Sequence, residues 1–331
     1  MKKKHYPNFV KIIFSFFIIV TLQLCGCKDI ITDYSKSGFA FDTVIEITVY
    51  DNNKEHAESV LNSCMDLCNY YDSVFNISNP SSDIYKINNS DGKAVKVSDD
   101  TIDIIKRSVF YSEISNGIFD ITIEPLYELW DFNNSSHEKI PDKDSILNEL
   151  ENVNYKTIEL SESDQTVTVP RGVKINLGAI AKGYIADKLK ELLTENNIDC
   201  ALINLGGNIL VFGEKPDKRS FNIGIQKPFS NTGEIITTVE ANNKSVVTSG
   251  IYQRYFEYEG NIYHHIIDPF TGYPADNELA SVTIIADSST DADAYSTICM
   301  LLGKEKANDF LKNIGSVSAV LIDKSGNITE Y

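Results

Sequence analysis

Residues 174–208, KINLGAIAKGYIADKLKELLTENNIDCALINLGGN, contain the order of elements that decides the fold. A short strand runs into the turn at Gly178, apolar residues recur at helical spacing over about 180–195, and a second apolar run spans 199–204 before two glycines. This pattern predicts strand, helix, strand and a tight turn. Free N–H groups at the helix start favour an anion, and Lys182 adds a mobile positive charge. The spacing matches neither the phosphate loop GxxxxGKS/T nor the dinucleotide motif GxGxxG.

Strands and helices follow one another without regular alternation outside this segment. Alternating β-branched residues predict a strand at 41–50, and helical spacing predicts helices at 55–75 and 101–114. We expect residues 133–145 to form a loop. The other predicted elements are a hairpin near 156–160 and 166–169, several strands up to about 286, helices at about 290–302 and 304–313, and a last strand at 317–322. This order favours an α+β fold with mixed or antiparallel sheets and flanking helices over a doubly wound α/β fold.

The amino terminus has the composition of an export signal. The first eleven residues carry four Lys and no acid, and the apolar run at 12–24 is too short to span a bilayer. The run ends in Cys25-Gly26-Cys27, which looks like a lipobox. We predict a lipoprotein signal peptide at 1–26, a lipidated Cys27 and a polar tether at 27–37. An uncleaved membrane anchor is the alternative, and both interpretations place the rest of the chain outside the cytoplasmic membrane.

Composition excludes several classes of protein. The chain has 331 residues, a net charge of −17 and 42% hydrophobic residues, which is too apolar for a disordered chain. The acidic balance argues against nucleic acid as a partner, because phosphate binding needs clustered positive charge. Removing residues 1–26 leaves 26 basic against 47 acidic residues, a net charge of −21. Anionic headgroups repel such a surface, so we expect attachment through the lipid. The remaining cysteines are Cys64, Cys68, Cys200 and Cys299, and we interpret Cys64 and Cys68, four apart in a predicted helix, as buried apolar residues.

Two adjacent histidines form an unusual cluster at the end of an aromatic strand. His264 and His265 precede Asp268-Pro269 and a Thr-Gly turn. Adjacent strand residues point to opposite faces, so at most one histidine should face a given pocket. A neutral imidazole there could act as a general base or a metal ligand. The alternative is a pair of core or solvent-facing histidines around a sharp turn.

A capped helix near 287–303 carries the second candidate. Ser289 or Thr290 is a suitable N-cap, and Gly303 a suitable stop. Asp293 and Thr297 are four residues apart, so they share a helix face. A carboxylate with hydroxyl groups is a hard oxygen set that suits Mg²⁺. The alternative is an ordinary capped helix whose acids complement its dipole.

Two further segments are less specific. Residues 116–126 place apolar side chains around Asp120, which suits either a wall for a ring-shaped ligand or a core segment with a capping Asp. The glycine turn at 204–208 suits either close approach of the backbone to a ligand or a tight hairpin.

Taken together and in order, these motifs resemble the ApbE family, the FAD:protein FMN transferases. The matching motifs span roughly residues 38–325, which we predict to be one catalytic domain followed by a tail at 326–331. They are Phe41-Asp42-Thr43, residues 82–88, Gly117-Ile118-Phe119-Asp120-Ile121-Thr122, residues 176–184, Gly206-Gly207, Thr248-Ser249-Gly250, residues 265–272 and residues 293–297.

The resemblance implies an activity and a set of site residues. The protein should use Mg²⁺ and FAD, transfer FMN to a Ser or Thr hydroxyl of an exported or membrane flavoprotein subunit of a redox complex, and release AMP. His265 is the implied base, oriented by the turn that begins at Asp268. The implied residues are, for Mg²⁺, Ala179, Asp293, Ser296 and Thr297, and, for FAD, Phe41, Ser78, Ile118, Phe119, Asp120, Asn176, Lys182 and Ile267.

Two residues depart from the family pattern. Phe41 stands where the family has Met, and both can pack on an adenine face. Asn176 stands where the family has Asp. Its amide can still form hydrogen bonds but carries no charge, so an acid–base or metal-linked role of that Asp would be lost. An Mg²⁺-dependent FAD pyrophosphatase and a non-catalytic FAD-binding lipoprotein are therefore the alternative functions.

Overall fold

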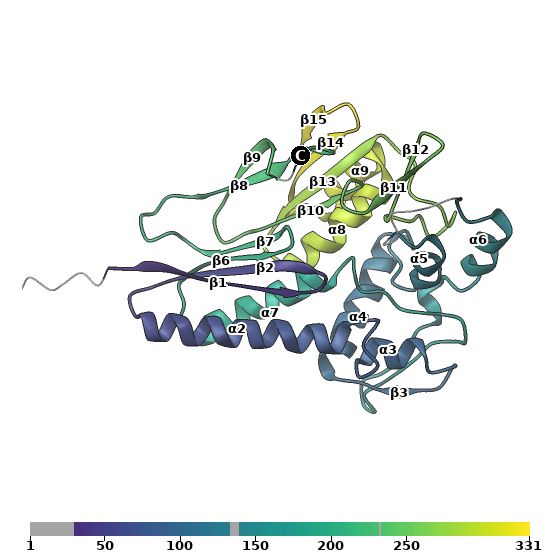
Figure 1. Ribbon diagram of the computed structural model, residues 1–331, viewed down its shortest axis with the longest axis horizontal. Helices are drawn as coiled ribbons and strands as arrows, with labels where there is room; N and C mark the ends of the chain where they lie inside the picture. Colours follow the sequence, from purple (N-terminus) through teal and green to yellow (C-terminus); the bar gives the residue numbers. More distant parts are fainter. Residues whose placement is uncertain (1–29, 133–138, 232) are drawn as a thin grey trace, which may run out of the picture.

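The computed structural model describes residues 30–132, 139–231 and 233–331 (Figure 1). Its centre is an eight-stranded sheet in the order β1-β2-β6-β7-β10-β13-β14-β15, and every neighbouring pair of strands is antiparallel. The strands are β1 (Thr32–Ala40), β2 (Thr43–Asp51), β6 (Cys200–Leu205), β7 (Asn208–Gly213), β10 (Ser245–Gly250), β13 (Leu279–Ala286), β14 (Ser318–Asp323) and β15 (Ile328–Glu330).

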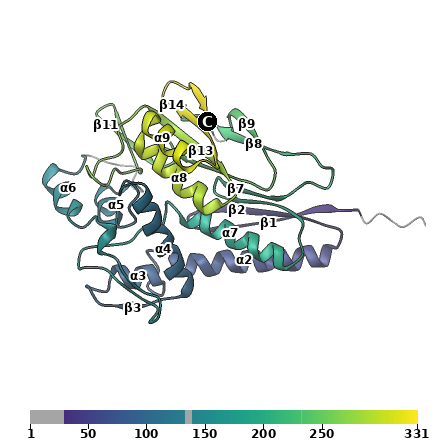
Figure 2. The ribbon, with the colours of Figure 1, turned by 180° about the vertical axis from the view of Figure 1, so that it is seen from behind.

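Helices cover one face of this sheet, and smaller units complete the molecule (Figures 1 and 2). The helices are α2 (Lys54–Phe75), α3 (Asp83–Asn88), α4 (Asp99–Ile114), α5 (Glu124–Trp130), α6 (Lys143–Leu150), α7 (Ala181–Glu195), α8 (Ser289–Leu302), α9 (Lys304–Ile314) and the 3₁₀ turn η1 (Tyr155–Thr157). The smaller sheets are β3-β5-β4 (Val95–Lys96, Thr166–Thr168, Glu159–Ser161), β8-β9 (Phe221–Gln226, Ile235–Ala241) and β11-β12 (Tyr255–Tyr258, Asn261–His264).

The main core lies between the sheet and the layer that α2, α7 and α8 form. Strand β2 alternates as expected, with Ile45, Ile47 and Val49 fully buried against these helices. Cys64 and Cys68 lie on the buried face of α2, which confirms their interpretation as apolar core residues. Burial raises the pKa of both thiols to about 12, so they stay protonated and unreactive. The predicted α+β class with antiparallel sheets is confirmed.

Both ends of the predicted domain need correction. Residues 32–37, predicted as tether, belong to β1, which pairs with β2 along nine residues. Residues 328–330, predicted as tail, form β15 at the opposite edge. Side chains of these edge strands are mostly exposed, so backbone pairing fixes them without an apolar pattern.

The signal peptide and Cys27 lie outside the described residues. Within the described ranges, no helix has the length and apolar character needed to cross a membrane.

Two local predictions were also wrong. The predicted loop at 133–145 ends in the first turn of α6, a short helix with only Ile146 buried. Helix α8 begins one residue earlier than expected, because Ser288 is its N-cap and accepts from the Asp291 N–H. Gly303 does end the helix, with a φ of 73°.

Candidate active site

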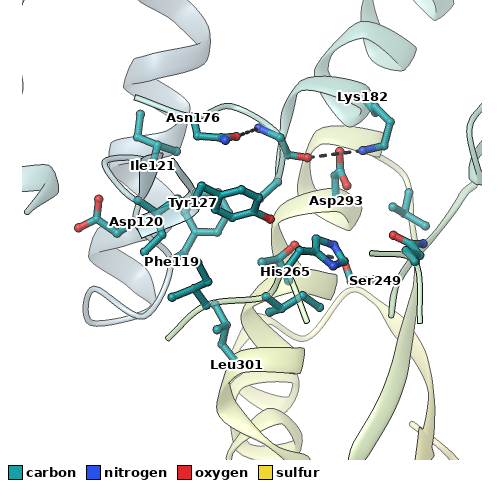
Figure 3. A pocket seen from close by; sticks show the side chains of 18 of the residues that line it. Phe119, Asp120, Ile121, Tyr127, Asn176, Lys182, Ser249, His265, Asp293 and Leu301 are labelled. Carbon is teal, nitrogen blue, oxygen red and sulfur yellow. Dashed lines mark hydrogen bonds between the residues drawn. The ribbon is translucent and has the colours of Figure 1, made fainter. Parts of the chain in front are cut away.

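A cavity that is partly open to solvent lies where the sheet, α7, α8 and the segment before α5 meet (Figure 3). Residues from six of the predicted motifs line it. The lining residues include Ile118, Phe119, Asp120, Tyr127, Asn176, Ala179, Lys182, Gly206, Asn208, Ser249, His265, Ile267, Asp293 and Thr297. Motifs as distant in the chain as those of Ile118 and Thr297 therefore form one site.

Helices α7 and α8 cap each other at the polar end of this cavity. Helix α7 has no side-chain cap of its own, and the Gly183 N–H in its first turn donates to Asp293 Oδ2 at 2.8 Å. In return, Asp187 of α7 accepts from the backbone N–H groups of Ser289 and Thr290 at the start of α8. A Cβ on Gly183 would lie 2.3 Å from the carbonyl oxygen of Ser289, so only glycine permits this approach.

Three of the four predicted Mg²⁺ ligands line the cavity. Asp293 is 4% exposed, and Ala179 and Thr297 belong to the same lining. Burial raises the pKa of Asp293, while Lys182, the Gly183 N–H and the Asn208 amide lower it. Ser296 is different: it does not line the cavity, and its fully buried hydroxyl contacts the Asp293 carbonyl and Ser249 Oγ.

The donor set fits a hard divalent cation. No cluster of three His, Cys, Asp or Glu that could hold a metal exists in the described part of the chain. One buried carboxylate with neutral oxygen donors is a set that Mg²⁺ accepts when water and phosphate supply its other ligands. The Asn208 amide is buried beside Asp293 and favours the charged form of this carboxyl, which is the form that a cation needs.

The two histidines point to different surroundings, as predicted. His264 is 3% exposed and its Nε2 contacts the Ala275 carbonyl at 3.1 Å, so it is a core histidine. His265 lines the cavity, and its Nδ1 lies 3.1 Å from the Arg254 carbonyl (Figure 3). That contact makes Nδ1 the protonated nitrogen and leaves Nε2 as the acceptor. Burial lowers the pKa of His265 to about 3, and the positive charges of Arg254 and Lys182 add to this effect.

Two predicted acids organise turns. Asp120 accepts from the N–H and hydroxyl of Thr122 and from the Tyr155 N–H, and its carboxylate points away from the cavity centre (Figure 3). Asp268 does not line the cavity and accepts from the Phe270 N–H. The turn that Asp268 begins is anchored by Trp130, whose Nε1–H donates to the Gly272 carbonyl at 2.8 Å.

The apolar part of the cavity includes Ile118, Phe119 and Ile267. The Asn176 N–H donates to the Ile121 carbonyl at 2.7 Å, which joins this wall to the glycine turn before α7. Lys182 projects from the start of α7, with Nζ 3.5 Å from the Gly178 carbonyl. Two predicted FAD residues lie elsewhere: neither Phe41 nor the exposed Ser78 lines the cavity.

Sequence reasoning missed three residues of this site. The side chain of Tyr127 lies in the middle of the cavity (Figure 3), and its hydroxyl forms no hydrogen bond within the described chain. Asn208 was seen only as part of a glycine turn. Glu124 is 5% exposed and holds the Asn176 amide from behind. The three-residue spacing of Glu124 and Tyr127 on one helix was the available signal.

Comparisons with known proteins agree with these motifs. The model of the ApbE family matches residues 41–321. A FAD:protein FMN transferase of Klebsiella pneumoniae is 34% identical, with 89% of this chain and 90% of the relative covered. One of Treponema pallidum is 33% identical over 92% of this chain and 88% of its own. The crystal structure of the ApbE protein of Thermotoga maritima superposes with a TM-score of 0.83 at 32% identity, covering 90% and 96%.

Proposed function

The chain belongs to the ApbE family, and we propose that it transfers the FMN half of FAD to a Ser or Thr hydroxyl of an exported or membrane flavoprotein subunit, releasing AMP. One observation carries the proposal: a single cavity joins an apolar wall to a buried carboxylate, a lysine and a neutral histidine. The wall suits the flavin ring. The polar end suits the pyrophosphate, which a protein of this negative charge binds only with local positive groups.

The reaction exchanges one P–O bond for another. The acceptor hydroxyl oxygen attacks the phosphorus of the FMN half, the bond to the bridging oxygen breaks, and AMP leaves with that oxygen. His265 Nε2 takes the hydroxyl proton, since Nδ1 is held by the Arg254 carbonyl. Lys182 balances charge on the phosphoryl oxygens. The negative pyrophosphate also raises the pKa of His265 from its low value in the free protein, which makes it a better base.

Asp293, Thr297 and the Ala179 carbonyl would hold Mg²⁺. The ion would supply Lewis-acid neutralisation of the charge that develops on the phosphoryl oxygens. Ser296 supplies no ligand in this arrangement, because its buried hydroxyl contacts the backbone carbonyl of Asp293 and Ser249 Oγ. Gly183 keeps the Asp293 carboxylate oriented through its N–H.

The place of action follows from the amino-terminal sequence. A lipid on Cys27 would tether the domain to the outer side of the cytoplasmic membrane. Exported redox subunits are within reach of such a tether. Mass spectrometry of the mature amino terminus tests this part: an acylated Cys27 supports it, and an intact residue 1–26 segment contradicts it.

The activity is tested with the purified mature chain, FAD, Mg²⁺ and a Ser/Thr-containing acceptor subunit. We expect a fluorescent adduct whose mass increases by one FMN, together with AMP. A Ser/Thr→Ala acceptor is the matched control. Free FMN and AMP without an adduct would favour the pyrophosphatase, and FAD that stays intact on the protein would favour a binding lipoprotein.

A further inference from the structure

Glu124 is a buried acid directly behind the wall of the FAD cavity. It begins α5 and is 5% exposed. Its Oε2 accepts a hydrogen bond from Asn176 Nδ2, and Asn176 lines the cavity. Asn176 Oδ1 in turn accepts from the Gly178 N–H at 2.7 Å. Both ends of this amide therefore have a partner, so its orientation is fixed.

The other charges around Glu124 do not replace this contact. Glu128, Lys174 and Tyr127 are the charged or titratable neighbours that act on it. The Lys174 ammonium forms its ion pair with Glu128 Oε2, on the exposed side of α5. Burial raises the pKa of Glu124 to about 7, while the Asn176 hydrogen bond and Lys174 lower it. The Asn176 amide is thus the group that holds the Glu124 carboxylate.

We propose that Glu124 is a positioning residue for FAD binding. Its carboxylate does not line the cavity itself but accepts from the Asn176 amide, which does, and so fixes the orientation of that amide. The resemblance to the family puts a carboxylate at position 176 itself. In this chain the amide and the acid form a pair in which the acid sits at 124. The inference rests on the proposed function only as far as FAD binding.

A return to the family residue at position 176 would ordinarily be expected to improve FAD binding, and the pairing with Glu124 predicts the opposite for Asn176→Asp. Restoring the residue of the family pattern would place two carboxylates against each other in a buried site. Like charges at this distance destabilise each other strongly, or one must take up a proton. The variant should therefore bind FAD more weakly. The reciprocal exchange Glu124→Gln with Asn176→Asp restores one acid and one amide, so it should bind well again.

The test measures FAD affinity of the intact mature chain by quenching of flavin fluorescence, at pH 6 and pH 8, with Mg²⁺ present. At pH 8 we expect Asn176→Asp to weaken binding by about 10- to 100-fold, the range covered by loss of a charged hydrogen bond. The loss should shrink at pH 6, where one carboxyl is protonated. Glu124→Ala alone should weaken binding by about 3- to 10-fold at pH 8, because the Asn176 amide then loses the acceptor that fixes its orientation.

Rescue decides between positioning and general structural damage. The double variant Glu124→Gln/Asn176→Asp should recover affinity to within about 3-fold of the native chain. The matched control is Glu128→Gln in the Asn176→Asp background, because Glu128 is an exposed acid on the same helix that does not contact Asn176; it should not rescue. Native affinity of Asn176→Asp at pH 8, or rescue by Glu128→Gln as well, would overturn the inference. A native chain that binds FAD but forms no FMN adduct would contradict the transferase activity. The FAD affinities of the four variants would still test the role of Glu124.

Discussion

The backbone N–H of Gly183 donates to Asp293 Oδ2 at 2.8 Å, so the acid at the polar end of the cavity is also the cap of α7. The free N–H groups of α7 carry a partial positive charge, which stabilises the buried carboxylate. The same contact fixes one carboxylate oxygen in space. A helix end and the proposed metal-binding residue therefore depend on each other.

Gly183→Ala should disturb both the start of α7 and the position of the Asp293 carboxylate. An ideal Cβ at this position lies 2.3 Å from the Ser289 carbonyl oxygen and 2.7 Å from Asp293 Cβ, so α7 and α8 must separate. We expect a loss of about 1 to 3 kcal/mol in the free energy of unfolding, despite the gain of about 1 kcal/mol that Gly→Ala brings in an ordinary helix. Urea unfolding measures it. Thr194→Ala, at an exposed position of the same helix, is the control and should be nearly neutral. A stabilised Gly183→Ala chain would contradict the close contact.

Asp293→Asn separates the two roles of this residue. The amide oxygen can still accept from Gly183, so the fold should persist, while the charge that would hold Mg²⁺ is lost. We expect FMN transfer to fall about 100-fold or more, with a higher Mg²⁺ requirement.

Asp187→Asn is the matched control, because Asp187 caps α8 in the same reciprocal contact but does not line the cavity. It should lower stability by about 1 kcal/mol and leave the Mg²⁺ titration unchanged. Equal Mg²⁺ responses in the two variants would argue against Asp293 as a ligand.

The sequence predicted those parts of the fold where side chains are buried. The apolar periodicities of β2, α2 and α7 reflect contact with one core. Strand β1 has no such period, because most of its side chains face solvent and backbone pairing with β2 holds it. Helix α6 buries only Ile146, so its apolar signal was too weak to read.

The residues of the candidate site also fall into those that a local sequence pattern predicted and those that it did not. Lys182, His265 and Asp293 were predicted because each lies in a local motif. Ser296 and Thr297 looked equivalent in sequence, yet one hydroxyl turns back to the Asp293 carbonyl while the other residue lines the cavity. Glu124 was missed because its partner Asn176 is 52 positions away, and its three-residue spacing from Tyr127 on α5 was the one local signal.

The contribution of His264 to stability should rise with pH between about 4 and 6.5. Burial lowers the pKa of His264 to about 4 in the folded chain, so the unfolded chain binds more protons over this window. A shift of this size contributes up to about 3 kcal/mol, which is present above pH 6.5 and lost as the pH falls towards 4. His264→Gln should flatten the dependence. Unfolding free energies at pH 4.5, 5.5, 6.5 and 7.5 measure it, and parallel curves for the two chains would contradict the prediction.

Tyr127→Phe tests whether the hydroxyl in the middle of the cavity contacts FAD. Burial raises the pKa of Tyr127, so the group is a neutral donor at all working pH values. Removing one such hydrogen bond should weaken FAD binding by roughly 3- to 10-fold without changing stability. Tyr258→Phe, outside the cavity lining, is the control. Unchanged affinity in Tyr127→Phe would place the hydroxyl outside the FAD contact.

The corrected position of the first strand predicts where truncation becomes harmful. Deleting residues up to Ile31 removes no paired strand residue and should leave the unfolding midpoint unchanged. Deleting residues up to Ala40 removes all nine residue pairs between β1 and β2. It also uncovers Met65, because Gly38 packs so closely on this side chain that a Cβ at position 38 would lie 2.3 Å from Met65 Cε. The exposed edge of β2 would then be open to pairing with other chains. We expect a loss of at least about 2 kcal/mol and concentration-dependent association, seen by urea unfolding and light scattering. If both truncated chains behaved alike, β1 would be a dispensable tether after all.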